Sequence, residues 1–87
     1  MNFNYCIFVT PKSNTKKNFI HNKINGRSCK IESLIVGCPA CFSYLTSENE
    51  IYRIKTSYVK DISYKEDGNI FVETTNSFYK FKKIGEN

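Results

Sequence analysis

The sequence predicts an all-β domain, a small antiparallel barrel of about five to seven strands with a long basic loop near its N-terminus. Short strand-like runs recur about every ten residues. After Lys30, no stretch of about ten or more residues has helical periodicity. The 87 residues form one domain, 1–87. An SH3-like or OB-like barrel fits this spacing best, and so small a barrel is filled by its own side chains. Function is therefore expected on a face, a rim or the basic loop.

The strands are expected where apolar residues alternate or where β-branched and aromatic residues gather. In the first run Ile7 and Val9 share one face with Phe3 and Tyr5. Asp67-Gly68 supplies the positive φ of a tight hairpin turn, and residues 75–77 form another short turn. The expected strands are 3–10, 31–36, 40–45, 51–56, 59–64, 70–74 and 78–84.

The excess positive charge lies in one segment, residues 11–30. The whole chain has 13 basic and 8 acidic residues, a formal charge of +5. Residues 11–30 contain no Asp or Glu, and they hold six cations: Lys12, Lys16, Lys17, Lys23, Arg27 and Lys30. The Asn, Ser, Lys and Gly content predicts a loop or arm with a short helix around 16–23, and its apolar anchors are Phe19, Ile20 and Ile24. Such an arm binds phosphates or an acidic protein surface, or it is only a solvated loop.

Aromatic and basic residues alternate in two expected strands, at 52–55 and at 78–83. The alternation fits rings in the core with lysines in water, which we favour, and it also fits a platform on which bases stack. The carboxylates of Glu50, Asp61 and Glu73 weaken any phosphate-binding field on these strands. The expected partner-binding residues are Lys12, Lys16, Lys17, Phe19, Lys23, Arg27, Tyr52, Arg53, Lys55, Lys80 and Lys82.

The four cysteines include one C-x-x-C pair, Cys38 and Cys41. That spacing allows two thiolates to meet one metal, and Cys29 with either Cys6 or His21 would complete a tetrahedral zinc site. A zinc-stabilised structural module is therefore one alternative. A redox role is disfavoured because a strand-like run, and no helix, follows the pair. The favoured interpretation is that the thiols are free and packed in a reducing cytosol, with no cofactor.

Catalysis and membrane insertion are not expected. The chain has one histidine, His21, with no carboxylate near it in sequence, and Glu66 and Asp67 lie in a turn. Its four glycines form no phosphate-binding loop. No apolar run reaches the ~18–20 residues of a membrane-spanning helix, and the first residues lack the features of a secretory signal. The expected location is the cytoplasm.

The second half of the chain, residues 51–81, has a recognisable skeleton of strand and turn residues. These include Thr56-Ser57, Asp61-Ile62, Val72, Thr74, Asn76-Ser77, Tyr79 and Phe81. This segment resembles short all-β accessory proteins of low-GC Gram-positive bacteria and their phages, and the Lys-, Asn- and Ile-rich composition suits such AT-rich genomes. The resemblance implies an anti-defence protein such as an anti-CRISPR inhibitor. The same Thr-Ser and Asn-Ser pairs could alternatively present hydroxyl and amide groups to a nucleotide.

These observations predict a non-catalytic binding or inhibitor protein. Its basic arm would dock on a nucleoprotein or on the nucleic-acid-binding surface of an immune effector, with Phe19 or Ile20 as the anchor. The alternative is a small β-barrel that binds single-stranded nucleic acid by itself.

Overall fold

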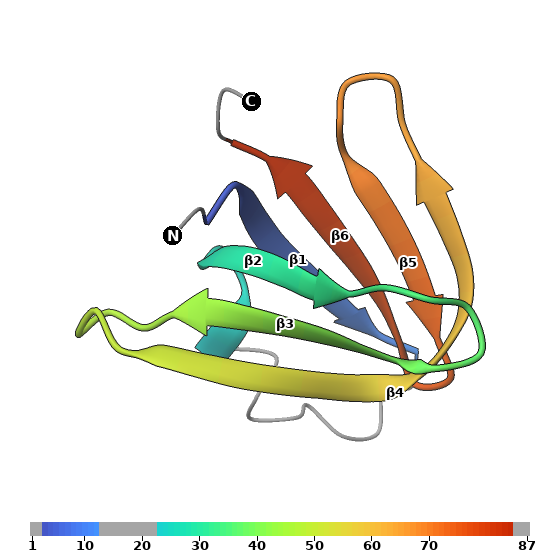
Figure 1. Ribbon diagram of the computed structural model, residues 1–87, viewed down its shortest axis with the longest axis horizontal. Helices are drawn as coiled ribbons and strands as arrows, with labels where there is room; N and C mark the ends of the chain where they lie inside the picture. Colours follow the sequence, from blue (N-terminus) through green and yellow to red (C-terminus); the bar gives the residue numbers. More distant parts are fainter. Residues whose placement is uncertain (1–2, 13–22, 85–87) are drawn as a thin grey trace.

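Each strand pairs antiparallel with the strand that follows it in the chain, and the last strand pairs with the first to close a barrel (Figure 1). The computed structural model describes residues 3–12 and 23–84. The strands are β1 (Tyr5–Pro11), β2 (Ser28–Ser33), β3 (Pro39–Leu45), β4 (Ile51–Tyr64), β5 (Ile70–Thr74) and β6 (Ser77–Lys83). The predicted small all-β barrel is confirmed. Within the described ranges no helix has the length and apolar character needed to cross a membrane.

Two strands differ from the sequence prediction. We expected a strand at 31–36, but β2 ends at Ser33, because Ile35 and Val36 belong to a turn that the Cys38 amide closes on the Ile35 carbonyl. The two strands expected at 51–56 and 59–64 are one continuous β4 of 14 residues. Irregular pairing near Pro39 and near Val59 lets β4 bend between its two partners without a turn.

The ends of the basic segment are part of the barrel and not of a free arm. Pro11 ends β1, and residues 28–30 begin β2. Ile24 is 1% exposed and belongs to the hydrophobic core. The Val9 amide donates a hydrogen bond of 2.6 Å to Asn25 Oδ1, and the Ile7 amide donates one of 3.0 Å to the Arg27 carbonyl. Because β1 and β2 share only two register pairs, residues 24–27 complete the seam between these strands.

The centre of the cationic segment, 13–22, lies outside the described residues. It contains Lys16, Lys17, Phe19, Ile20 and His21 together with most of the expected helix at 16–23. The predictions for those residues therefore stay predictions.

Aromatic rings from β3 and β6 meet in the core. The ring centres of Phe42 and Phe81 are 5.6 Å apart, and those of Phe42 and Tyr79 are 6.0 Å apart, both in edge-to-face geometry. Ile7, Val9 and Val72 are also buried in this cluster. Tyr79 and Phe81 thus face inward, as the favoured interpretation expected for the rings of this strand, whereas Phe78 is 49% exposed and does not. The strict alternation of β6 leaves the even-numbered side chains for the outer face.

The two hydroxyl- and amide-containing pairs stabilise the bend of β4. The Asn76 amide donates a hydrogen bond of 3.2 Å to Ser57 Oγ, and the Thr75 amide donates one of 3.0 Å to the Tyr58 carbonyl. Thr74 Oγ1 accepts a hydrogen bond from the Ser77 amide across the β5–β6 turn. These contacts join the turn to β4, so the structure gives both pairs a structural role.

Candidate functional site

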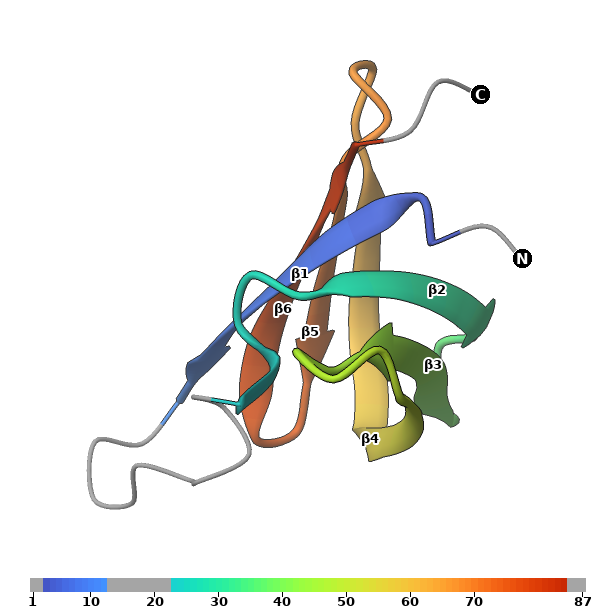
Figure 2. The same cartoon turned by 90° about the vertical axis from the view of Figure 1, so that its left-hand side faces the viewer.

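Three phenylalanine rings are exposed on the outer face of β1, β6 and β5, which lie side by side in Figures 1 and 2. Phe8, Phe71 and Phe78 are 41%, 39% and 49% exposed. Phe8 and Phe71 both pair with Lys80, one from each side of β6. Phe78 lies two residues before Lys80 and points the same way. We call the surface formed by Phe8, Phe71, Phe78, Lys12 and Lys80 the aromatic face.

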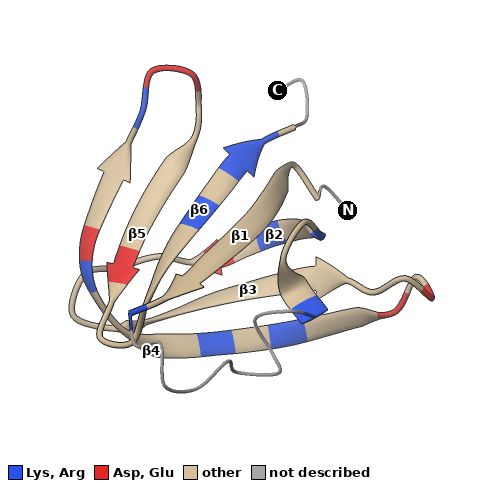
Figure 3. Cartoon of the chain, turned by 180° about the vertical axis from the view of Figure 1, so that it is seen from behind, with Lys and Arg blue, Asp and Glu red and all other residues tan. Residues whose placement is uncertain are grey.

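Lysine ammonium groups lie close to these rings. Lys12 Nζ is 5.1 Å from the centre of the Phe78 ring, and Lys80 Nζ is 5.7 Å from the centre of the Phe71 ring. Lys65 Nζ, from the β4–β5 turn, is 5.5 Å from the same Phe71 ring. Figure 3 shows further basic positions along β6, where Lys82 follows Lys80 on the outer side. The face therefore combines flat apolar rings with positive charges close to them.

One carboxylate on this surface is paired. Lys12 Nζ donates a hydrogen bond of 2.6 Å to Glu73 Oε2, and this contact lowers the pKa of Glu73 below its usual 4.5. Desolvation opposes this hydrogen bond with a smaller effect on the pKa, and the charges of Lys12 and Lys60 lower the pKa further. Glu73 therefore remains ionised at neutral pH, and its charge is largely offset by Lys12.

A groove of about 170 Å³ crosses the outer side of β4, β5 and β6 at the edge of the aromatic face. Phe71 and Phe78 line it, as do the polar side chains Asp61, Ser63 and Glu73. Asp61 and Glu73 are direct cross-strand partners, and Ser63 is the partner of Phe71. Aromatic and acidic groups thus share one depression in the surface.

A second basic region lies on the outer face of β2, β3 and β4, and Lys30, Arg53 and Lys55 provide its cations. Arg53 Nε is 2.9 Å from Glu32 Oε1. The Ser43 hydroxyl donates a hydrogen bond of 2.5 Å to the other oxygen of Glu32, and this bond, ahead of Arg53, lowers the pKa of Glu32. The exposed ring on this side of β4 is Tyr58, which pairs with Pro39 of β3 and is 62% exposed.

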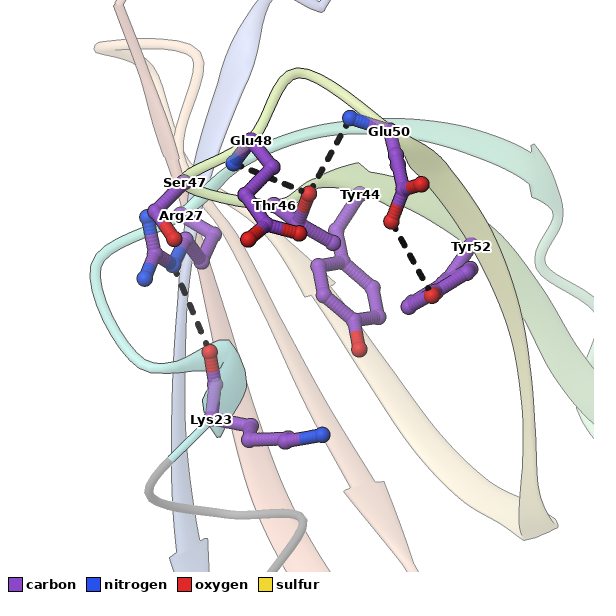
Figure 4. A pocket seen from close by; sticks show the side chains of 8 residues that line it. All are labelled: Lys23, Arg27, Tyr44, Thr46, Ser47, Glu48, Glu50 and Tyr52. Atoms are coloured by element: carbon purple, nitrogen blue, oxygen red, sulfur yellow. Dashed lines mark hydrogen bonds between the residues drawn. The ribbon is translucent and has the colours of Figure 1, made fainter.

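A third location is a pocket of about 270 Å³ beside the β3–β4 turn (Figure 4). Tyr44 and Tyr52 pack edge to face there, with ring centres 6.0 Å apart. The Tyr52 hydroxyl donates a hydrogen bond of 3.2 Å to Glu50 Oε1, which raises the pKa of Tyr52. Lys23 and Arg27 line the opposite side of this pocket (Figure 4). Its charges are mixed, so it lacks the consistent sign of a phosphate site.

The expected partner-binding residues therefore occupy three separate places in the described ranges. Lys12, Lys80 and Lys82 lie on or beside the aromatic face, Arg53 and Lys55 lie on the β2–β3–β4 face, and Lys23, Arg27 and Tyr52 lie at the pocket of Figure 4. Phe8 and Phe71 were not among the residues expected to bind a partner. The alternation of apolar residues could have indicated that both rings point outward. Phe8 lies between the inward Ile7 and Val9, and Phe71 lies between the inward Ile70 and Val72.

The four cysteines do not form a metal site. Cys29 is buried and Cys38 is exposed, with Cys6 and Cys41 intermediate, and all four are free thiols. In residues 3–12 and 23–84 no three His, Cys, Asp or Glu side chains are close enough to share a metal ion. The thiols of Cys6, Cys29, Cys38 and Cys41 therefore do not come together as the ligands of one zinc ion. Burial, and to a smaller extent the neighbouring Cys6, raise the pKa of Cys29 from 9.0 to about 12.

No family model, no curated protein and no solved structure matches this chain.

Proposed function

We propose that the protein is a non-catalytic barrel that binds single-stranded nucleic acid on its aromatic face. The observation that carries the proposal is the row Phe8–Lys80–Phe71, in which two exposed rings flank one lysine across three adjacent strands. By the usual strand spacing these two rings are about 10 Å apart. Bases can stack on separate rings while the lysine between them meets the phosphate that links the nucleotides.

The interaction free energies favour a stacked base over the ammonium groups that now lie near the rings. An exposed cation–π contact contributes about 0.5–1 kcal/mol. A base stacked on an aromatic side chain contributes about 1–3 kcal/mol, and the displaced ammonium then gains a phosphate. Lys65 and Lys80 can make this exchange because each reaches its ring from outside the core, whereas Lys12 is already paired with Glu73.

Binding should be measured by fluorescence anisotropy with labelled single-stranded DNA and RNA. At about 50 mM salt the protein should bind, and affinity should fall steeply by about 200 mM because phosphate contacts release counterions. Phe71→Leu keeps an apolar side chain but removes the stacking ring, so it should cost about 1–3 kcal/mol of binding free energy. Absence of binding at low salt would rule the proposal out.

Tyr58→Leu is the matched control. Tyr58 is 62% exposed, on β4 at the bend and not on the aromatic face. The same loss of an exposed ring there should leave the affinity unchanged. Equal effects of the two variants would remove the aromatic face from the mechanism.

A protein partner is the second candidate, the docking role of a phage-type inhibitor. One observation favours it: Ile35, Val36 and Tyr58 are 57%, 56% and 62% exposed, an apolar surface that nucleic acid does not require. This candidate predicts no binding to free nucleic acid. It predicts salt-sensitive binding to a nucleoprotein, weakened when Lys16, Lys17 and Lys23 are replaced by Ala.

A further inference from the structure

Phe71 and Phe78, on the neighbouring strands β5 and β6, both line the groove. The two residues are diagonal neighbours, since Phe71 pairs with Lys80 and Phe78 pairs with Glu73. Diagonal neighbours in a sheet are about 7–8 Å apart. A flat ring packed against another needs about 3.5–4.0 Å on each side. The two side chains are therefore close enough for one flat heterocycle to contact both rings.

The size of the groove agrees with a single base and not with a larger ligand. Its volume is about 170 Å³, well below the ~300–1,000 Å³ of pockets that enclose drug-sized molecules. Val72 and Tyr79, whose side chains are buried in the core, also line it and limit its depth.

The polar residues of the groove are acceptors for hydrogen-bond donors. Asp61 has no ion pair or side-chain hydrogen bond with any other residue in the described part of the chain, whereas one oxygen of Glu73 is occupied by Lys12. Asp61 lies directly across from Glu73, and Ser63 lies two residues further along the same outer side of β4. A base in the groove would therefore meet one free carboxylate, one partly occupied carboxylate and one hydroxyl.

We infer that this groove selects guanine, an inference that rests on the proposed binding of single strands. Guanine presents N1–H and the exocyclic N2–H₂ side by side, and these two donors match the two oxygens of the Asp61 carboxylate. Thymine and uracil present one N–H between two carbonyl oxygens, which repel a carboxylate. Cytosine and adenine present an amino group beside a ring acceptor, so they satisfy only one carboxylate oxygen. The carboxylates of Asp61 and Glu73, which weaken phosphate binding, would thus contribute to recognition of the base.

The test compares labelled oligothymidylates of about 12 nucleotides, within the usual range of sites on small barrels. One strand contains only thymine, one has a single central guanine and one has hypoxanthine at that position, which lacks the exocyclic amine. Guanine should bind about five- to tenfold more tightly than thymine, with hypoxanthine between them. Asp61→Asn should abolish this preference, because an amide presents a donor where guanine needs an acceptor.

Glu66→Gln is the charge-matched control, since Glu66 is an exposed carboxylate in the turn at the far end of the β4–β5 hairpin (Figure 3). It should keep the preference for guanine. Equal affinity for guanine and thymine would overturn this inference while the proposed function stands. Retention of the preference in Asp61→Asn, with thermal unfolding unchanged, would overturn the role of Asp61. Failure of all three strands to bind at low salt would overturn the proposed function itself.

Discussion

The hydroxyl oxygen of Thr56 accepts a hydrogen bond of 2.9 Å from the Ala40 amide, at the point where β3 and β4 lose regular pairing. The same hydroxyl donates a bond of 2.6 Å to the Ser57 carbonyl. A side chain therefore replaces a ladder hydrogen bond inside the barrel wall, where both Ala40 and Thr56 are buried. This contact is a reason that β4 can bend and pair with β3 and β5 in turn.

Thr56→Val should lower the free energy of unfolding by about 1–3 kcal/mol, because the buried Ala40 amide loses its acceptor. Thr10→Val is the control, since Thr10 is exposed on β1 and should change stability by less than about 0.5 kcal/mol. Urea denaturation of both variants measures the difference. A Thr56→Val protein as stable as the parent would show that the bend does not depend on this hydroxyl.

Ile24→Ala tests whether the end of the cationic segment is part of the core. The side chain is 1% exposed, so its truncation should cost about 2–5 kcal/mol of stability. Ile35→Ala removes a similar side chain that is 57% exposed, and it should be nearly neutral. Similar melting temperatures for the two variants would indicate that Ile24 leaves the barrel in solution.

The Lys12–Glu73 pair predicts a pH dependence. The pKa of Glu73 is lowered in the folded state, so its contribution to stability is present above the usual value of 4.5 and is lost as pH falls through the folded value. In an NMR titration Lys12→Gln should raise the pKa of Glu73 towards 4.5. Lys30→Gln, on the other side of the barrel, should leave it unchanged. A Glu73 titration that is identical in all three proteins would contradict the ion pair.

Cys29 should resist alkylation. Its thiol is buried with a pKa of about 12, whereas Cys38 is exposed. At neutral pH iodoacetamide should modify Cys38 within minutes and Cys29 only on unfolding, as mass spectrometry of the native and denatured protein can show. Because the raised pKa favours the neutral thiol in the folded state, this contribution to stability is lost as pH rises from about 9 towards 12. Rapid native labelling of Cys29 would indicate local opening of the β1–β2 seam.

The alternation of apolar residues predicted most of the barrel, because each strand has one face in the core. Ile7 and Val9 are buried as expected, and Gly68 adopts the positive φ of 92° that its turn requires. The sequence could not reveal the bend of β4, because Ser57-Tyr58 has the composition of a turn. Hydrogen bonds to Thr56, Ser57 and Tyr58 from residues far away in the chain hold the strand together there.

The candidate site was only partly predictable. Lys80 and Lys82 were expected to bind a partner, and they do lie on the outer side of β6. Phe8 and Phe71 come from strands far apart in sequence, and only the pairing of β1 with β6 places them on either side of Lys80. The chemistry of Asp61 likewise depends on the register of β4 with β5, which local patterns do not determine.

The pairing of β1 with β6 along all seven residues of β1 also governs how the chain acquires its structure. The barrel can close only after β6 has been synthesised, because β1 pairs with β2 over a short seam and depends on β6 for most of its pairing. Contacts between such distant parts of a chain form slowly, on a timescale of milliseconds to seconds. A chain in which β6 has not yet paired would expose Ile7 and Val9 to solvent, so the core is completed only when the last strand meets the first.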